Sequence, residues 1–186
     1  MRTFLLSSFP TLSLQAPAPL TLEAFLTRCA QHLSVGDMDE LEAVCEQPPG
    51  GDSAFARAWR AAWGEVRNFN DVARAGKLPP EALDSKAVAQ PYAYDRLRSG
   101  TKAAWESGDP LSRERLLLEA KWDWLEERRR AAPYSEADLF AYAIQLRLLE
   151  IRDTWREEDG VTQFDEQAKT FLSPVLDQLF PKAVSA

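Results

Sequence analysis

The sequence contains few of the side chains that usually bind metals or carry nucleophilic catalysis. It has one histidine, His32, and two cysteines, Cys29 and Cys45, at spacings that match no metal site and no disulfide scaffold. It also has no glycine-rich phosphate-binding loop and no Gly-x-Ser-x-Gly turn. We therefore expect free thiols with Cys29 in the core, no metal or cofactor, no small-molecule ligand such as ATP, and no hydrolase triad.

Long apolar runs and positive charge are scarce as well. No run approaches the roughly eighteen apolar residues that a membrane span needs, so we expect no membrane insertion. The 22 Lys and Arg residues are outnumbered by 29 Asp and Glu, which gives a formal net charge of -7. Nucleic-acid binding needs a basic face that neutralises phosphates, so this class of partner is not expected.

What the sequence does contain is the composition of a cytoplasmic globular domain. Of its 186 residues, 45% are hydrophobic, enough to bury a core. The first twenty residues make a poor secretion signal because Pro10 ends their short apolar run. We therefore expect a cytoplasmic location.

Helical periodicity accounts for most of the chain. Apolar residues recur at three- and four-residue spacing, and capping residues precede several of these stretches, among them Thr21, Asp37, Asp109 and Ser135. Only residues 2–8 hint at period-two alternation, so we expect a short extended or strand-like N-terminal segment. The sequence predicts an all-α, single-domain multi-helix bundle over residues 1–186. Two sub-units, 1–78 and 90–186, joined by a Pro-containing connection, are a possible subdivision.

A helix expected over residues 135–159 is apolar on nearly every side in its middle, which indicates a central position. A helical wheel groups four polar residues on its solvent side: Asp138, Gln145, Arg152 and Arg156. Arg147 and Glu150 lie opposite, among apolar residues, at a spacing that lets side chains meet. We predict that they form an internal ion pair or network. Glu65, at the edge of the apolar stripe of an earlier helix, is a further candidate, and a catalytic or partner-facing role is the alternative.

Two features are candidates for a protein interface. Arg128, Arg129 and Arg130 end the helix that begins at Pro110, where cations favourably oppose the helix dipole. Trp63 and Trp105 are less clearly inward-facing than the other tryptophans. Exposed aromatic and arginine side chains often dominate binding energy at interfaces, whereas a solvated helix end is the simpler interpretation of the arginines.

Four segments of the chain together resemble a known family. They are the opening Phe4–Leu12, then Glu65–Asn68, then Asp109–Glu126 with Trp122, and finally Leu139–Glu150. They resemble the domain of unknown function 2764 family, whose genes tend to lie among those of bacterial V/A-type ATPases. Thr3 and Lys121 depart from the family pattern. The segment from Ala141 to Arg152 is also distantly similar to the helical cap of V-type ATPases, named C or d, which joins the central stalk to the membrane rotor.

The resemblance implies a non-catalytic structural subunit or an assembly or accessory factor of a bacterial V/A-type rotary ATPase. Its partners would be other subunits of that complex, and it would lie at the membrane only through them. Two alternatives remain: a small helical enzyme that uses buried carboxylates such as Glu65 and Glu150, and a stand-alone helical adaptor or regulator. A large polar pocket containing both glutamates would favour the enzyme.

Overall fold

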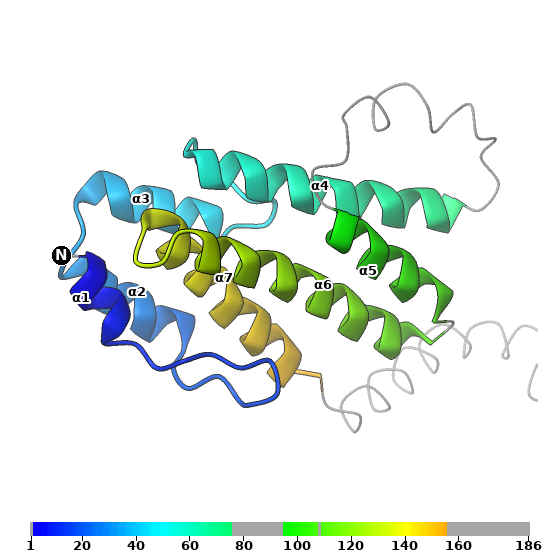
Figure 1. Ribbon diagram of the computed structural model, residues 1–186, viewed down its shortest axis with the longest axis horizontal. Coiled ribbons are helices and arrows are strands. Elements are labelled where there is room, and N and C mark those ends of the chain that lie inside the picture. The colour runs from blue at the N-terminus through cyan, green and yellow to red at the C-terminus, as the bar shows by residue number, and fades with distance from the viewer. Residues whose placement is uncertain (1, 76–94, 108, 156–186) are drawn as a thin grey trace, which may run out of the picture. The chain divides into compact units, whose positions relative to one another are not determined.

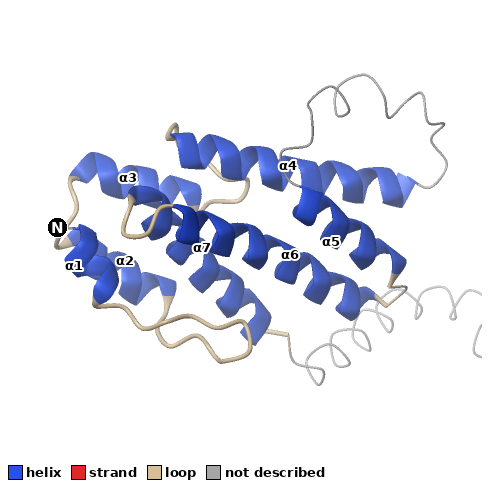
Figure 2. Cartoon of the chain, in the orientation of Figure 1, coloured by secondary structure: helices blue, strands red, loops and turns tan. Residues whose placement is uncertain are grey.

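The chain is built from helices wherever the structure describes it. The structure is a computed structural model that describes residues 2–75, 95–107 and 109–155. Within these ranges it has seven helices and no strand, which confirms the all-α prediction (Figures 1 and 2): α1 (Arg2–Ser7), α2 (Leu22–Ala30), α3 (Val35–Val44), α4 (Ala54–Ala75), α5 (Asp95–Glu106), α6 (Pro110–Ala131) and α7 (Glu136–Asp153). None of these helices is both long enough and apolar enough to cross a bilayer.

Contacts divide the chain after Glu150, into a larger unit of residues 1–150 and a smaller one of residues 151–186. The Pro-containing connection expected near residues 78–90 lies outside the described residues, as does a helix expected from residue 162. Helices α4 and α5, on either side of that connection, both belong to the larger unit. The contacts therefore place a division elsewhere than the sequence suggested.

The N-terminal segment differs from the expectation of an extended or strand-like start. Residues 2–7 form α1, and the hydroxyl of Ser8 donates a hydrogen bond back to the Leu5 carbonyl at 2.7 Å. Leu5, Leu6 and Phe9 are all buried. Their three- and four-residue spacing puts them on one side of a helix, whereas a strand would turn Leu5 and Leu6 to opposite faces. Burial of both leucines therefore favours the helix.

Local capping sets most of the helix starts. The Oγ1 of Thr21 accepts from the Ala24 N–H at 3.1 Å, and Asp109 accepts from Ser112 N–H at 2.7 Å just before Pro110. These two predicted caps are confirmed. Helix α3 begins earlier than expected because Ser34, and not Asp37, is its cap.

Glu40 stabilises the start of α4 and does not complete a capping box on its own helix. Its carboxylate accepts from the backbone N–H groups of Asp52 at 3.0 Å and Ser53 at 2.7 Å. Slight burial works in the opposite direction, but these donors hold the pKa of Glu40 below its usual range.

Aromatic side chains form the core between α4, α6 and α7. The ring of Phe55 on α4 lies 6.0 Å from Trp124 of α6 and 5.8 Å from Phe140 of α7. Trp59 approaches Trp124 to 5.4 Å. All residues from Asp138 to Leu146 are buried, so α7 is the central helix, as predicted.

Helix α5 approaches α6 closely at a glycine. A Cβ atom added at Gly100 would lie 2.6 Å from the Cβ of Ala120, a separation that real side chains do not show. The crossing of the two helices therefore requires a residue without a side chain at this position.

Candidate functional site

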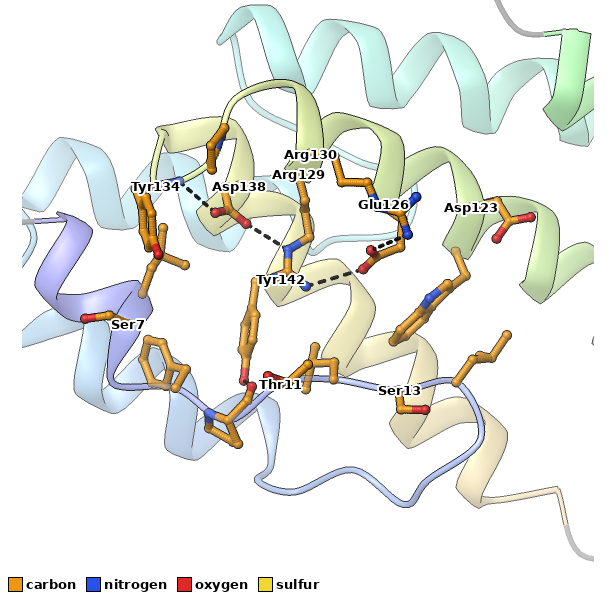
Figure 3. Close-up of a pocket in the computed structure, with 17 residues that line it drawn as sticks. Ser7, Thr11, Ser13, Asp123, Glu126, Arg129, Arg130, Tyr134, Asp138 and Tyr142 are labelled. Atoms are coloured by element: carbon orange, nitrogen blue, oxygen red, sulfur yellow. Dashed lines mark hydrogen bonds and ion pairs between the residues drawn. The ribbon is translucent and has the colours of Figure 1, made fainter.

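A pocket of about 700 Å³ lies between the N-terminal segment, the C-terminal half of α6 and the beginning of α7 (Figure 3). The hydroxyl-bearing residues Ser7, Thr11 and Ser13 line one side. Charged side chains from α6 and α7 line the other side: Asp123, Glu126, Arg129, Arg130 and Asp138. Segments more than a hundred residues apart in the sequence therefore build this pocket.

A closed polar network forms one wall of the pocket. Arg129 donates from Nε to Asp138 at 2.7 Å and from Nη1 to the Gln145 side chain at 2.8 Å. Gln145 in turn donates to Glu126 at 2.8 Å. Gln145 is 0% exposed, and both polar ends of its side chain have partners. Because buried polar groups are costly unless bonded, such a network stabilises the packing of α6 on α7.

The prediction that Asp138 and Gln145 face solvent was wrong, since both are buried. A helical wheel assigns polar residues to solvent because it has no knowledge of what lies opposite them. Here Arg129, on the preceding helix, supplies the donors that make their burial favourable. Arg129 itself was a candidate for a free interface cation, and it is held inside this network.

Tyr142 connects the network to the N-terminal segment. Its hydroxyl donates to the Pro10 carbonyl at 2.8 Å, and its ring stacks on Phe9 at 5.4 Å and Phe25 at 5.2 Å. The Arg129 guanidinium lies 5.2 Å from the same ring. Burial raises the pKa of Tyr142 to about 12 although neighbouring arginine charges oppose the rise. Tyr142 therefore stays protonated at neutral pH and acts as a hydrogen-bonding tether.

The turn between α6 and α7 holds Tyr134 in a left-handed backbone conformation, with φ of 61°. A side chain in this region costs about 1–2 kcal/mol relative to the right-handed region. The backbone N–H of Tyr134 donates to Asp138 at 2.8 Å, and the Ser135 hydroxyl accepts from the Asp138 N–H at 3.2 Å. The predicted cap at Ser135 is thus confirmed. The same carboxylate that binds Arg129 fixes the turn, while Tyr134 remains 51% exposed.

The structure places Arg147 and Glu150 at the ends of two other helices. Glu150 accepts from the Leu22 backbone N–H at the start of α2 at 2.7 Å, and Arg147 donates to the Cys45 carbonyl at the end of α3. Among the described residues no ion pair joins Arg147 to Glu150, so the expected pair is replaced by two helix-end contacts. An anion near a helix N-terminus and a cation near a C-terminus both oppose the helix dipole.

The other predicted site residues lie apart from the pocket. Glu65 is half-buried on α4, and Trp63, also half-buried, has the Arg67 guanidinium 5.7 Å from its ring. Arg128 lies over the buried Trp124 at 4.8 Å. The side chain of Trp105 lies outside the described residues. Of the three arginines that end α6, only Arg130 is fully on the surface, with 80% of its side chain exposed.

A second pocket, of about 670 Å³, contains Glu150 beside residues of α2 and α3. Glu65 does not line it, so this pocket does not unite the two glutamates in the way the enzyme hypothesis requires. Burial raises the pKa of both Cys29 and Cys45 to about 12, and the two thiols are therefore protonated at neutral pH. In the described ranges no three His, Cys, Asp or Glu side chains are grouped closely enough to hold a metal ion.

Comparisons of this chain with protein-family models, with curated proteins and with solved structures find no match.

Proposed function

We propose that this chain is a non-catalytic structural subunit or assembly factor of a bacterial V/A-type rotary ATPase and that it acts by protein contact. The observation that carries the proposal is that segments responsible for the family resemblance pack against one another. Phe9 and Pro10 of the opening segment contact Tyr142. Glu126 of the second long segment binds Gln145, three residues beyond Tyr142. The resemblance thus lies in one core and not in scattered surface residues.

The surface of the same core supports a role in contact. Tyr134 is half-exposed and Arg130 almost fully exposed, and both line the pocket. Aromatic and arginine side chains are the types most enriched at the energetic centres of protein interfaces. In the proposed role the chain is cytoplasmic and reaches the membrane only through the ATPase complex.

The proposal is tested by affinity purification of the tagged chain from its own organism at low and high salt. We expect ATPase subunits to co-purify, with less recovered at high salt because ionic contacts weaken when the Debye length falls to a few ångströms. The chain alone is expected to hydrolyse no ATP. The proposal fails if no ATPase subunit is recovered under either condition and deletion of the gene leaves ATPase assembly and ATP-driven pumping unchanged.

A further inference from the structure

We propose that the α6–α7 turn is a docking surface on which Tyr134 and Arg130 engage a partner protein. The partner offers an apolar recess for the ring of Tyr134 and a carboxylate for the guanidinium of Arg130. This inference rests on the proposed function only in naming that partner as an ATPase subunit. The residues that form the surface are assigned from the geometry alone.

The backbone of Tyr134 is the first observation. Glycine and asparagine tolerate a positive φ far better than tyrosine does, so a large exposed ring at φ of 61° is an unfavourable choice for a simple turn. Such outliers persist where the surrounding structure imposes them, and they gather at functional positions. With about half of its surface exposed, Tyr134 recovers only part of the burial that a core aromatic would gain.

The support beneath Tyr134 is the second observation. Asp138 binds the Tyr134 N–H and the Arg129 guanidinium at the same time, and Gln145 holds Arg129 from the other side. Figure 3 shows these side chains converging below the turn. The position of the ring is therefore set by buried groups before any partner arrives. Preorganisation of this kind lowers the entropy cost of binding.

Arg130 gives the surface its charge preference. Its contact with Glu126 spans 3.4 Å, longer than the roughly 2.7–2.9 Å of a strong charge-assisted bond, and Glu126 already accepts from Gln145. The guanidinium can therefore turn from Glu126 to a carboxylate on a partner at little cost. Arginine favours carboxylates because its planar fork matches them in geometry.

Helix α1 adds a second exposed aromatic beside the turn. Figure 3 shows Ser7 of α1 next to Tyr134, and both residues line the pocket. Phe4, one helical turn before Ser7, is 72% exposed. The surface thus combines two exposed aromatic rings with one exposed cation.

The test places the photo-cross-linker p-benzoylphenylalanine at Tyr134 in the full chain, expressed in its own organism. The matched control places it at Val35 of α3, which is 79% exposed and does not line the pocket. We expect irradiation to join the Tyr134 position, and not the Val35 position, to one ATPase subunit. The substitution Arg130→Glu is expected to lower the cross-link yield by about tenfold, the effect of losing a strong interface contact.

The outcomes separate the docking surface from the proposed function. A cross-link from the Tyr134 position to one defined protein outside the ATPase, lost with Arg130→Glu, would support the surface and reject the ATPase assignment. Equal cross-linking from both positions, or none from the Tyr134 position while ATPase subunits still co-purify, would overturn the surface alone. Cross-links between two copies of the chain would overturn the assignment of a different partner protein.

Discussion

Arg129 and Arg130 are neighbours on α6, yet they lie in opposite environments. Arg129 is held by Asp138 and Gln145 beneath the α6–α7 turn, whereas most of the Arg130 side chain is in solvent. A one-residue step turns a side chain by about 100° around a helix, which is enough to move it from a packed wall to a rim. The comparison shows that one arginine cluster can supply both packing and a binding surface.

The two ends of the central helix use their polar side chains differently. Near its start, Asp138 and Gln145 bind side chains of α6. Near its end, Arg147 and Glu150 bind backbone groups at the ends of α3 and α2. A side-chain network fails as a unit when one member is removed, whereas a helix-end contact affects mainly the one group that it satisfies.

The largest effect on stability is expected from Asp138→Ala. This change removes the partner of Arg129 and the acceptor of the Tyr134 N–H, and the loss of one partner from a buried pair typically costs about 3–5 kcal/mol. We expect about 3 kcal/mol in denaturant unfolding, since Arg129 keeps its contacts with Gln145 and Glu126. Arg130→Ala is the matched control and should cost under about 1 kcal/mol. Equal losses in the two variants would contradict the contrast between the arginines.

Glu150→Ala should have an intermediate effect of about 1–2 kcal/mol. It leaves the Leu22 N–H at the start of α2 without its carboxylate acceptor, which resembles the loss of a helix cap. Glu23→Ala, an exposed acid in the first turn of the same helix, is the control and should change the unfolding free energy by less than about 0.5 kcal/mol. If both variants unfold at the same denaturant concentration as the wild type, the helix-end role of Glu150 is wrong.

Tyr142→Phe should cost about 1 kcal/mol at neutral pH, because it removes the hydrogen bond to the Pro10 carbonyl. It should also alter the alkaline limb of the stability curve. The phenol ionises near pH 10 in the unfolded chain and at about 12 in the folded protein, so wild-type stability falls as pH rises across that interval. The variant should show a shallower fall, with Cys29 and Cys45 still contributing from about pH 9. Parallel curves for the two proteins would contradict a folded-state shift at Tyr142.

Features that depend on neighbours in the sequence could be predicted. The caps at Thr21, Asp109 and Ser135 each bind an N–H three residues later, and the core position of Cys29 follows from helical spacing. The helical state of residues 2–7 was missed because a short segment with two adjacent leucines fits both periodicities poorly.

Features that depend on distant partners could not be predicted. Glu150 finds its acceptor role at Leu22, 128 positions away, and nothing in the local sequence signals that partner. The network of Asp138 and Gln145 likewise depends on how α6 is placed across α7. Tyr134 carried no signal either, since its positive φ is a property of the folded turn.

The central claim, that the rim of the α6–α7 turn binds a partner while its buried side holds the fold, is tested most directly by Tyr134→Gly. Glycine relieves the cost of the positive φ, keeps the N–H that Asp138 accepts, and removes the ring. Melting temperature and co-purification of ATPase subunits are measured on the same preparation. The account predicts a melting temperature no lower than that of the wild type and a roughly tenfold loss of recovered subunits. A lower melting temperature with undiminished recovery would contradict it.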